Sequence, residues 1–222
     1  MKNNVQVLTE ADWSSKVDRV FLPDANDYNK KTYLNRYMLV LEKVLRFHRG
    51  STVIDCACGD GSGSAFLAEQ CPGWNILGVD LNAEMIDFAC DRYATKFNNL
   101  SYAAKSIIDI EEETDIFVCL ETIEHIDREL MIRVLNKIAD KLLKKGGKLV
   151  ISTPRLRPRE STVKRPGHIN ELYYQEFKYI LGDLFPMLEF YGLDRYANLV
   201  PDSSDNNCVV AICSTWPTTS IF

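Results

Sequence analysis

The feature that most constrains the fold is a glycine-rich loop that follows a short run of strand-forming residues. Residues 52–57 are mostly apolar or β-branched, and glycines follow at alternating positions, at Gly59, Gly61 and Gly63. Glycine adopts positive φ freely and lets a ligand approach the backbone closely. A helix expected from about Ser64 would present unpaired N–H groups there, where a ligand carboxylate or phosphate can bind. The segment therefore predicts a strand, a tight turn and a helix around a ligand.

The rest of the chain alternates between strand-like runs and segments with helical spacing of apolar residues. Further strands are expected at 75–79, 100–104, 115–120, 148–152, 187–191 and 208–213. Further helices are expected at 33–47, 83–96, 127–143 and 171–181, and a turn at 145–147. This alternation favours an α/β fold: a Rossmann-like, seven-stranded, mostly parallel sheet with helices on both faces and a C-terminal antiparallel hairpin. We expect one domain over residues 1–222, with residues 1–31 as an N-terminal extension.

Composition narrows the class of protein. With 46% hydrophobic and 26% charged residues, the chain can build a core and is not expected to be disordered. A net charge of −5 argues against a nucleic-acid partner, because phosphates repel an acidic protein. Neither a signal peptide nor a membrane span is expected. Seven cysteines, mostly in apolar runs, indicate reduced thiols and the cytoplasm of a bacterium, or of the host cell if the protein is viral. A homodimer is left open.

An acidic residue after the second strand points to the kind of ligand. Asp80, in Leu77-Gly-Val-Asp-Leu81, ends the second expected strand and lies 17 residues beyond Gly63. A carboxylate at that strand end can accept hydrogen bonds from both hydroxyls of a ribose. Taken separately, the glycines could simply form a tight turn, and Asp80 could simply cap the next helix. The combination favours a ligand that contains adenosine.

The spacing of the loop distinguishes two such ligands. A dinucleotide site has the pattern G-x-G-x-x-G, whereas this chain has Asp55, Ala57, Gly59, Gly61 and Gly63 at every second position. This spacing resembles motif I of class I methyltransferases, D-x-G-x-G-x-G, with alanine in the first glycine position. The resemblance extends over roughly residues 33–192.

The resemblance implies that S-adenosyl-L-methionine is the methyl donor and the cofactor. In that family, residues after the first, second, third and fourth strands surround the donor. The positions map onto Asp55, Ala57, Gly59 and Gly61 around the methionine part, Asp80 on the ribose, Leu81 against the adenine, and Leu120 and Glu121 along the pocket. Many relatives carry an acidic residue after the third strand, but this chain has Ser106 followed by Ile107.

The segment Glu121-Thr-Ile-Glu-His125 carries the candidate chemistry of the acceptor side. It follows the fourth strand, where the active site of an open α/β sheet is expected. Together with His168, the residues Glu121, Glu124 and His125 are the expected catalytic residues. They resemble an E-x-x-E-H set with a distant histidine that binds Mg²⁺ or Mn²⁺ in Hen1-type small-RNA 2′-O-methyltransferases and in ubiquinone-pathway O-methyltransferases. The same segment also occurs in methyltransferases without a metal, where Glu121 contacts the donor and His125 acts alone as a base.

Features outside these motifs suggest the acceptor. A loop at 153–169 is expected on the acceptor side, and its five basic residues could pair with phosphates or simply be solvated. Tyr33-Leu-Asn-Arg-Tyr37, Ala57 in motif I and the segment 167–192 resemble bacterial and viral methyltransferases of surface-polysaccharide synthesis. The first expectation is therefore O-methylation of a sugar hydroxyl in a glycan or nucleotide-sugar. The alternatives are a Hen1-like RNA 2′-O-methyltransferase and an O-methyltransferase of a phenol or quinone precursor.

Overall fold

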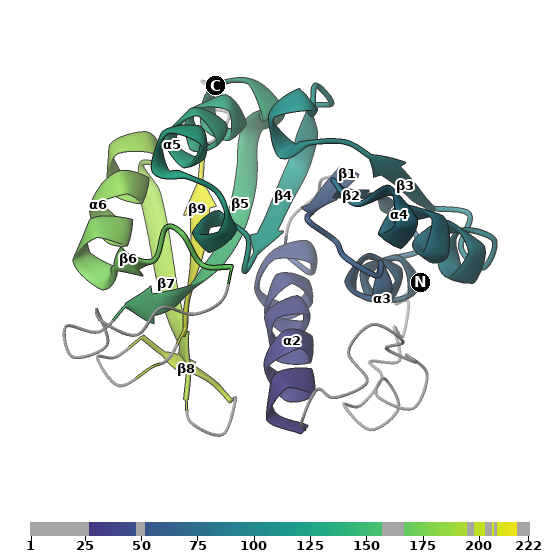
Figure 1. Cartoon of the computed structure of the whole chain (residues 1–222), viewed down its shortest axis with the longest axis horizontal. Coiled ribbons are helices and arrows are strands. Elements are labelled where there is room, and N and C mark those ends of the chain that lie inside the picture. The colour runs from purple at the N-terminus through teal and green to yellow at the C-terminus, as the bar shows by residue number, and fades with distance from the viewer. Residues whose placement is uncertain are drawn as a thin grey trace, which may run out of the picture.

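The structure is a computed structural model that describes residues 27–47, 52–156, 167–194, 198–202, 206 and 208–216. Figure 1 shows how the elements are arranged. The helices, with the π and 3-10 segments (η) beside them, are α2 (Asp27–Leu39), η1 (Val40–Leu45), α3 (Ser62–Gln70), α4 (Ala83–Ala89), η2 (Cys90–Ala94), η3 (Ile107–Asp109), η4 (Ile123–His125), α5 (Arg128–Lys137), η5 (Ile138–Leu142) and α6 (Tyr174–Leu184). The strands are β1 (Thr52–Cys56), β2 (Asn75–Asp80), β3 (Leu100–Ala104), β4 (Thr114–Leu120), β5 (Leu143–Leu156), β6 (Leu172–Tyr173), β7 (Met187–Leu193), β8 (Leu199–Pro201) and β9 (Cys208–Ser214).

A mostly parallel sheet forms the centre of the molecule, in the order β3-β2-β1-β4-β5-β9-β7-β8, with β6 beside β5. Strands β1 to β5 pair with one another in parallel, whereas β9 is antiparallel to both β5 and β7. The expected C-terminal antiparallel pair is therefore confirmed. The expected number of seven strands is wrong, because the described residues form nine. The two unexpected strands, β6 and β8, have two and three residues, too few to show a two-residue period.

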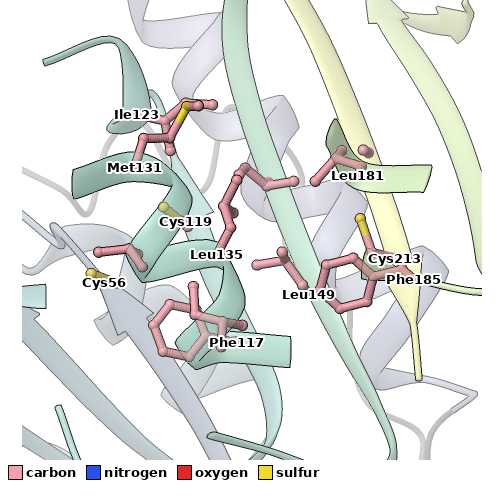
Figure 2. Packing of buried hydrophobic residues seen from close by; sticks show 14 of the residues in the cluster. Cys56, Phe117, Cys119, Ile123, Met131, Leu135, Leu149, Leu181, Phe185 and Cys213 are labelled. Atoms are coloured by element: carbon pink, nitrogen blue, oxygen red, sulfur yellow. The ribbon is translucent and has the colours of Figure 1, made fainter. Parts of the chain in front are cut away.

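Helices cover both faces of the sheet, as expected. Alternate residues of each strand face opposite sides, so that Val53 packs with α2 and α3 while Ile54 belongs to the cluster under α5 and α6. Figure 2 shows this second cluster, in which Leu135 and Leu181 lie near the strand residues Phe117 and Leu149. The central segments of β1, β4 and β5 are apolar at consecutive positions, at 53–54, 116–119 and 149–151, because both of their faces are buried.

The positions of several elements differ from the expectation. The helix expected from residue 171 begins at Tyr174, because the chain first pairs with β5 as β6. The turn expected at 145–147 lies inside the long strand β5, where the pairing with β4 shifts register between Thr114 and Ile116. The helix expected from 127 is confirmed, and Asp127 caps it by accepting the N–H of Leu130.

The sheet order contains the switch point at which ligands bind in folds of this kind. The connection from β1 leads to β2 on one side, while β4 pairs with β1 on the other. Ligands of open α/β sheets bind at such a switch point, beyond the carboxyl ends of the strands. The glycine loop, Asp80 and the segment 121–125 all follow those strand ends. None of the helices among the described residues is long and apolar enough to cross a membrane.

Candidate active site

The loop after β1 runs through left-handed backbone conformations. The φ angles are 57° at Ala57, 56° at Gly59 and 76° at Gly61. Gly61 also needs its missing side chain, because a Cβ would lie 2.5 Å from the Cβ of Ala89 and 2.8 Å from the ring of Tyr102. The Tyr102 hydroxyl donates to the Gly61 carbonyl at 2.7 Å. The loop is therefore held in a shape that strains Ala57, the alanine in a glycine position of motif I.

Asp80 closes the loop onto β2. Its Oδ2 accepts the N–H of Gly59 at 2.9 Å, and its Oδ1 accepts the N–H of Asn82 at 2.9 Å. The side chain of Asn82 in turn caps α4, as expected. Each carboxylate oxygen can accept a further hydrogen bond. The structure thus brings together Asp80 and the glycine loop, the pair that the sequence assigned to the donor.

The residues expected around the adenine follow the ends of the neighbouring strands. Leu81 is 76% exposed, so its side chain is free to cover a ring. The N–H of Lys105 donates to the carbonyl of Asp80 at 3.0 Å, which brings the end of β3 beside β2. Ser106 and Ile107 come directly after this contact, and both are half-buried. Their role toward the donor stays a prediction.

Asp55 lies beneath the loop and ties three elements together. It is 1% exposed, and its carboxylate accepts hydrogen bonds from Ser64 Oγ at 2.6 Å and from Tyr37 Oη at 3.1 and 3.2 Å. Burial raises the pKa of Asp55 to about 7, against the lowering effect of these two donors. The structure therefore places Asp55 as a link between β1, α2 and α3.

The start of α3 is less open to an anion than expected. The N–H of Ser62 donates to Asp60 Oδ1 at 3.0 Å, and the N–H of Gly63 donates to Tyr33 Oη at 2.9 Å. These groups of the chain itself take the place of a ligand carboxylate or phosphate. The expectation of free N–H groups at this helix is thus wrong for these two positions, because side chains from the loop and from α2 satisfy them.

Glu121 occupies a strained position at the end of β4. Its φ is 51°, a conformation that residues other than glycine rarely adopt. An ion pair with Arg36 Nη2 at 2.9 Å holds the carboxylate, and Ser152 Oγ donates to it at 2.8 Å. The thiol of Cys208 in β9 also donates to it at 3.3 Å. Strain of this kind concentrates at functional sites.

Glu124 lies in η4 and is almost completely buried, with an exposure of 1%. Its Oε2 accepts a hydrogen bond from Thr153 Oγ1 at 3.3 Å. Burial, followed by the charge of Glu121, raises the pKa of Glu124 above its ordinary value. A buried carboxylate of this kind favours a cation as neighbour, because a positive charge offsets the cost of ionising it.

The two site histidines lie against one another, although 43 residues separate them in the sequence. The rings of His125 and His168 make an edge-to-face contact with centroids 4.9 Å apart. His125 Nε2 is 4.0 Å from Glu124 Oε1. The N–H groups of Ile169 and Asn170 both donate to the carbonyl of Glu124, at 2.8 and 3.1 Å. These bonds fasten the segment after residue 166 to η4.

Three of the four expected metal ligands form one group that fits a cation. Glu124, His125 and His168 each offer a ligand atom, and these atoms lie within 4.8 Å of one another. Ligands at about 2.1 Å from one Mg²⁺ ion are at most about 4.2 Å apart, so a small contraction suffices. Glu121 is not part of this group and pairs with Arg36 instead.

The basic loop contributes differently from what we expected. Arg155 is 5% exposed, pairs with Asp202 at 2.8 Å and stacks on Tyr174. It therefore anchors the end of β5 and does not face a phosphate. The other four basic residues lie outside the described residues, at Arg157, Arg159, Lys164 and Arg165.

Sequence reasoning missed the contribution of α2 to the site. Tyr33, Arg36 and Tyr37 reach Gly63, Glu121 and Asp55, respectively. Their spacing of three and four residues puts them on one face of a helix. That polar stripe within an amphipathic helix was the available signal. Its partners could not be read from the sequence, because they belong to three other elements.

Comparison with known proteins agrees with this geometry. Residues 53–147 match the family model described as a methyltransferase domain. The ubiquinone biosynthesis O-methyltransferase of Coxiella burnetii (strain Dugway 5J108-111) is 34% identical over 109 residues, which cover 47% of this chain and 44% of that protein. The counterpart from Rickettsia bellii (strain OSU 85-389) is 29% identical over 126 residues, with coverages of 53% and 49%. The chain thus spans about half the length of the curated relatives it matches.

Solved structures match over more of the chain. The small RNA methyltransferase HEN1 superposes with a TM-score of 0.72 at 20% identity, covering 92% of this chain and 28% of that one. The N-methyltransferase NodS from Bradyrhizobium japonicum WM9, in complex with S-adenosyl-L-homocysteine, has a TM-score of 0.62 at 21% identity, with coverages of 86% and 89%. At these identities the superpositions establish the fold.

The chain has the Rossmann-like fold of the methyltransferases on which it superposes, and residues 53–147, which carry the loop after β1 and Asp80, match a methyltransferase domain. The ligand in the NodS complex is S-adenosyl-L-homocysteine, the demethylated form of S-adenosyl-L-methionine.

Proposed function

We propose that this protein is an S-adenosylmethionine-dependent O-methyltransferase whose acceptor oxygen binds beside a divalent cation at Glu124, His125 and His168. The observation that carries the proposal is the convergence of these three side chains at the sheet edge where β1 and β4 end side by side. A buried carboxylate and two imidazoles form a mixed oxygen and nitrogen donor set that can hold a divalent transition-metal ion such as Mn²⁺, whereas Mg²⁺ would need further oxygen ligands from the acceptor or from water. Glu121 lies beside them and is held in place by Arg36.

The donor would lie across the carboxyl ends of β1, β2 and β4. Asp80 keeps lone pairs for the ribose hydroxyls, and exposed Leu81 offers an apolar surface for the adenine. Backbone around Ala57, Gly59 and Gly61 would face the methionine part, and Leu120 would line the pocket. Ser106 and Ile107 would complete the adenine side.

The transfer itself requires alignment more than activation, because the sulfonium is already reactive. The acceptor oxygen attacks the methyl carbon, the carbon–sulfur bond breaks, and sulfur keeps the electron pair as S-adenosylhomocysteine forms. When bound, the cation would lower the pKa of the coordinated hydroxyl and so ease loss of its proton. The chain positions that hydroxyl, with Thr153 holding Glu124 and the ends of β4 and β5 fixing its distance from the donor loop.

The acceptor that we favour is a small phenol with two adjacent hydroxyls, because two neighbouring oxygens can share one cation. The curated relatives are named for ubiquinone biosynthesis, and a net charge of −5 disfavours a polyanion. The second candidate is the terminal ribose of an RNA, whose two hydroxyls offer the same chemistry. The structural match to HEN1 over 92% of the chain favours it. A sugar acceptor in a glycan or nucleotide-sugar, the first expectation from the sequence, has no comparable support.

A methyl-transfer assay with labelled donor tests the proposal. A catechol acid and a small RNA with a free terminal ribose are offered in parallel, each with Mg²⁺, with Mn²⁺ and with EDTA. We expect label on the catechol, loss of transfer in EDTA, and recovery with excess metal. Label on RNA alone would select the second candidate. Full transfer in EDTA would refute the metal role and leave His125 as the base that takes the hydroxyl proton on Nε2.

Two variants separate the residues. His125→Ala and His168→Ala should both abolish transfer while leaving the affinity for S-adenosylhomocysteine unchanged, because neither ring belongs to the donor loop. Unchanged turnover in both variants would remove the cluster from the mechanism. Arg128→Ala is a matched control, since it breaks a surface ion pair with Glu176 and should leave transfer intact.

A further inference from the structure

Both histidines of the cluster use the same ring nitrogen for support. His125 Nδ1 lies 3.0 Å from the carbonyl oxygen of Gly167. His168 Nδ1 lies 2.6 Å from Glu171 Oε1. A carbonyl and a carboxylate can only accept hydrogen bonds, so each neutral ring carries its proton on Nδ1. In both rings the Nε2 lone pair is therefore left for a ligand.

We propose that Glu171 is a positioning residue that fixes the tautomer and the orientation of His168 for cation binding. The inference rests on the function proposed above, and it assigns a role to a side chain outside the three candidate metal ligands. Carboxylates that accept the second N–H of a ligating histidine set its tautomer and raise its basicity. Glu171 fulfils the requirement for such a partner because it is itself held in place, with a side-chain exposure of 10% against 16% for His168.

The segment that carries Glu171 is fastened to the cluster at several points. Gly167 adopts a φ of 80°, which turns its carbonyl toward His125. Asn170 donates from its side chain to the carbonyl of Ile123 at 3.2 Å and is itself buried. Glu171 follows Asn170 directly and precedes β6, which pairs with β5. The carboxylate of Glu171 is thus presented from a rigid connection on which His168 also lies.

This arrangement explains why the spacing from His168 to Glu171 matters. The side chains of His168 and Glu171 stay in contact only if the backbone between the two residues keeps its conformation. The bonds from Ile169 and Asn170 to the Glu124 carbonyl provide that hold. His168 is therefore oriented from both sides, by Glu171 at Nδ1 and by the ring of His125.

Two readouts on the full chain test the proposal. Nitrogen-15 NMR of the imidazoles, without metal, reports which ring nitrogen carries the proton. We expect His168 to be protonated on Nδ1 in the wild type and in Glu171→Gln, whose amide oxygen still accepts, and to shift toward Nε2 in Glu171→Ala. His125 should keep its Nδ1 proton throughout, since its partner is the Gly167 backbone. Calorimetric titration with Mn²⁺ should show affinity reduced about 10- to 100-fold in Glu171→Ala and less in Glu171→Gln.

Glu176→Ala is the matched control, because Glu176 lies at the start of α6 and pairs with Arg128 on the surface. It should bind Mn²⁺ as the wild type does. An unchanged His168 tautomer together with unchanged Mn²⁺ affinity in Glu171→Ala would overturn the proposal. If Glu171→Ala does not fold, a Glu171→Gln variant in which His168 loses its Nδ1 proton while the Mn²⁺ affinity stays at the wild-type value would overturn it as well, because the tautomer would then not govern binding. A wild type that binds no Mn²⁺ would instead refute the metal role, while the NMR comparison would still decide the role of Glu171.

Discussion

Replacing Ala57 by glycine should stabilise the protein, although the change removes a methyl group. Ala57 has a φ of 57° and is exposed, so no buried surface is lost. Left-handed backbone costs a residue with a Cβ about 1–2 kcal/mol. Glycine also lowers the stability by about 0.4–1 kcal/mol, because it makes the unfolded chain more flexible. The net expected gain is therefore about 0.5–1 kcal/mol in the free energy of unfolding.

The neighbouring residue provides the reciprocal experiment. Gly59 has a φ of 56°, and a Cβ built on it meets nothing within 4 Å. Gly59→Ala should therefore destabilise the protein through backbone strain alone, by an amount similar to the gain in Ala57→Gly. The two substitutions exchange the same two residue types at nearly the same φ, so opposite signs are expected.

Equilibrium unfolding in urea, without the donor, measures both effects. With a denaturant slope of about 2 kcal/mol per M, the midpoint should rise by about 0.2–0.5 M for Ala57→Gly and fall by a similar amount for Gly59→Ala. Gly73→Ala is the control, because Gly73 lacks a positive φ and has open space at its Cβ. A lower midpoint for Ala57→Gly, or an unchanged one for Gly59→Ala, would refute the strain argument.

Three other changes test the supports of the site. Gly63→Ala would place a Cβ 2.0 Å from the ring of Tyr37. Thermal unfolding should therefore show a free energy of unfolding lower by about 1–3 kcal/mol or more. A variant as stable as the wild type would contradict this packing. Burial raises the pKa of Asp55 to about 7 from 3.8, so its contribution to stability is complete below about pH 4 and is lost as the pH rises through about 7. The free energy of unfolding should then fall by up to about 1.4 kcal/mol per pH unit across that window, and Asp55→Asn should lack this slope; equal slopes in urea titrations at several pH values would exclude the assignment. Asp80→Ala should weaken binding of S-adenosylhomocysteine at least 10-fold in calorimetry, as expected for loss of a charged hydrogen-bond partner of about 1.5–3 kcal/mol, and unchanged affinity would argue against the donor site.

The contact between the glycine loop and Asp80 was predictable because its signals are local. A strand, a glycine loop and a helix are adjacent in sequence, and Asp80 ends the next strand. Parallel strands bring their carboxyl ends to one edge, so the pairing of Asp80 with the Gly59 N–H follows from the order of elements. The same reasoning placed the segment 121–125 at that edge.

The grouping of Glu124, His125 and His168 was predictable only in part. The sequence suggested that His168 joins Glu124 and His125, but it contained no signal for the bonds that bring them together. The carbonyl of Gly167 and the Nδ1 of His125 are 42 positions apart. Contacts over such separations depend on where η4 and the chain before β6 come to lie. No periodicity within either segment encodes that position.

By itself, the sequence determined the alternation of strands and helices, the left-handed glycine loop, and the residue types in that loop and in the segment 121–125. Each of these depends on neighbours within a few positions. Only the tertiary structure decided that β9 lies between β5 and β7, that Arg36 holds Glu121, and that Glu171 supports His168. The physical reason is the range of the interactions. Backbone preferences and apolar spacing act along the chain, whereas buried charges and ring nitrogens find partners only after the sheet and its helices have packed.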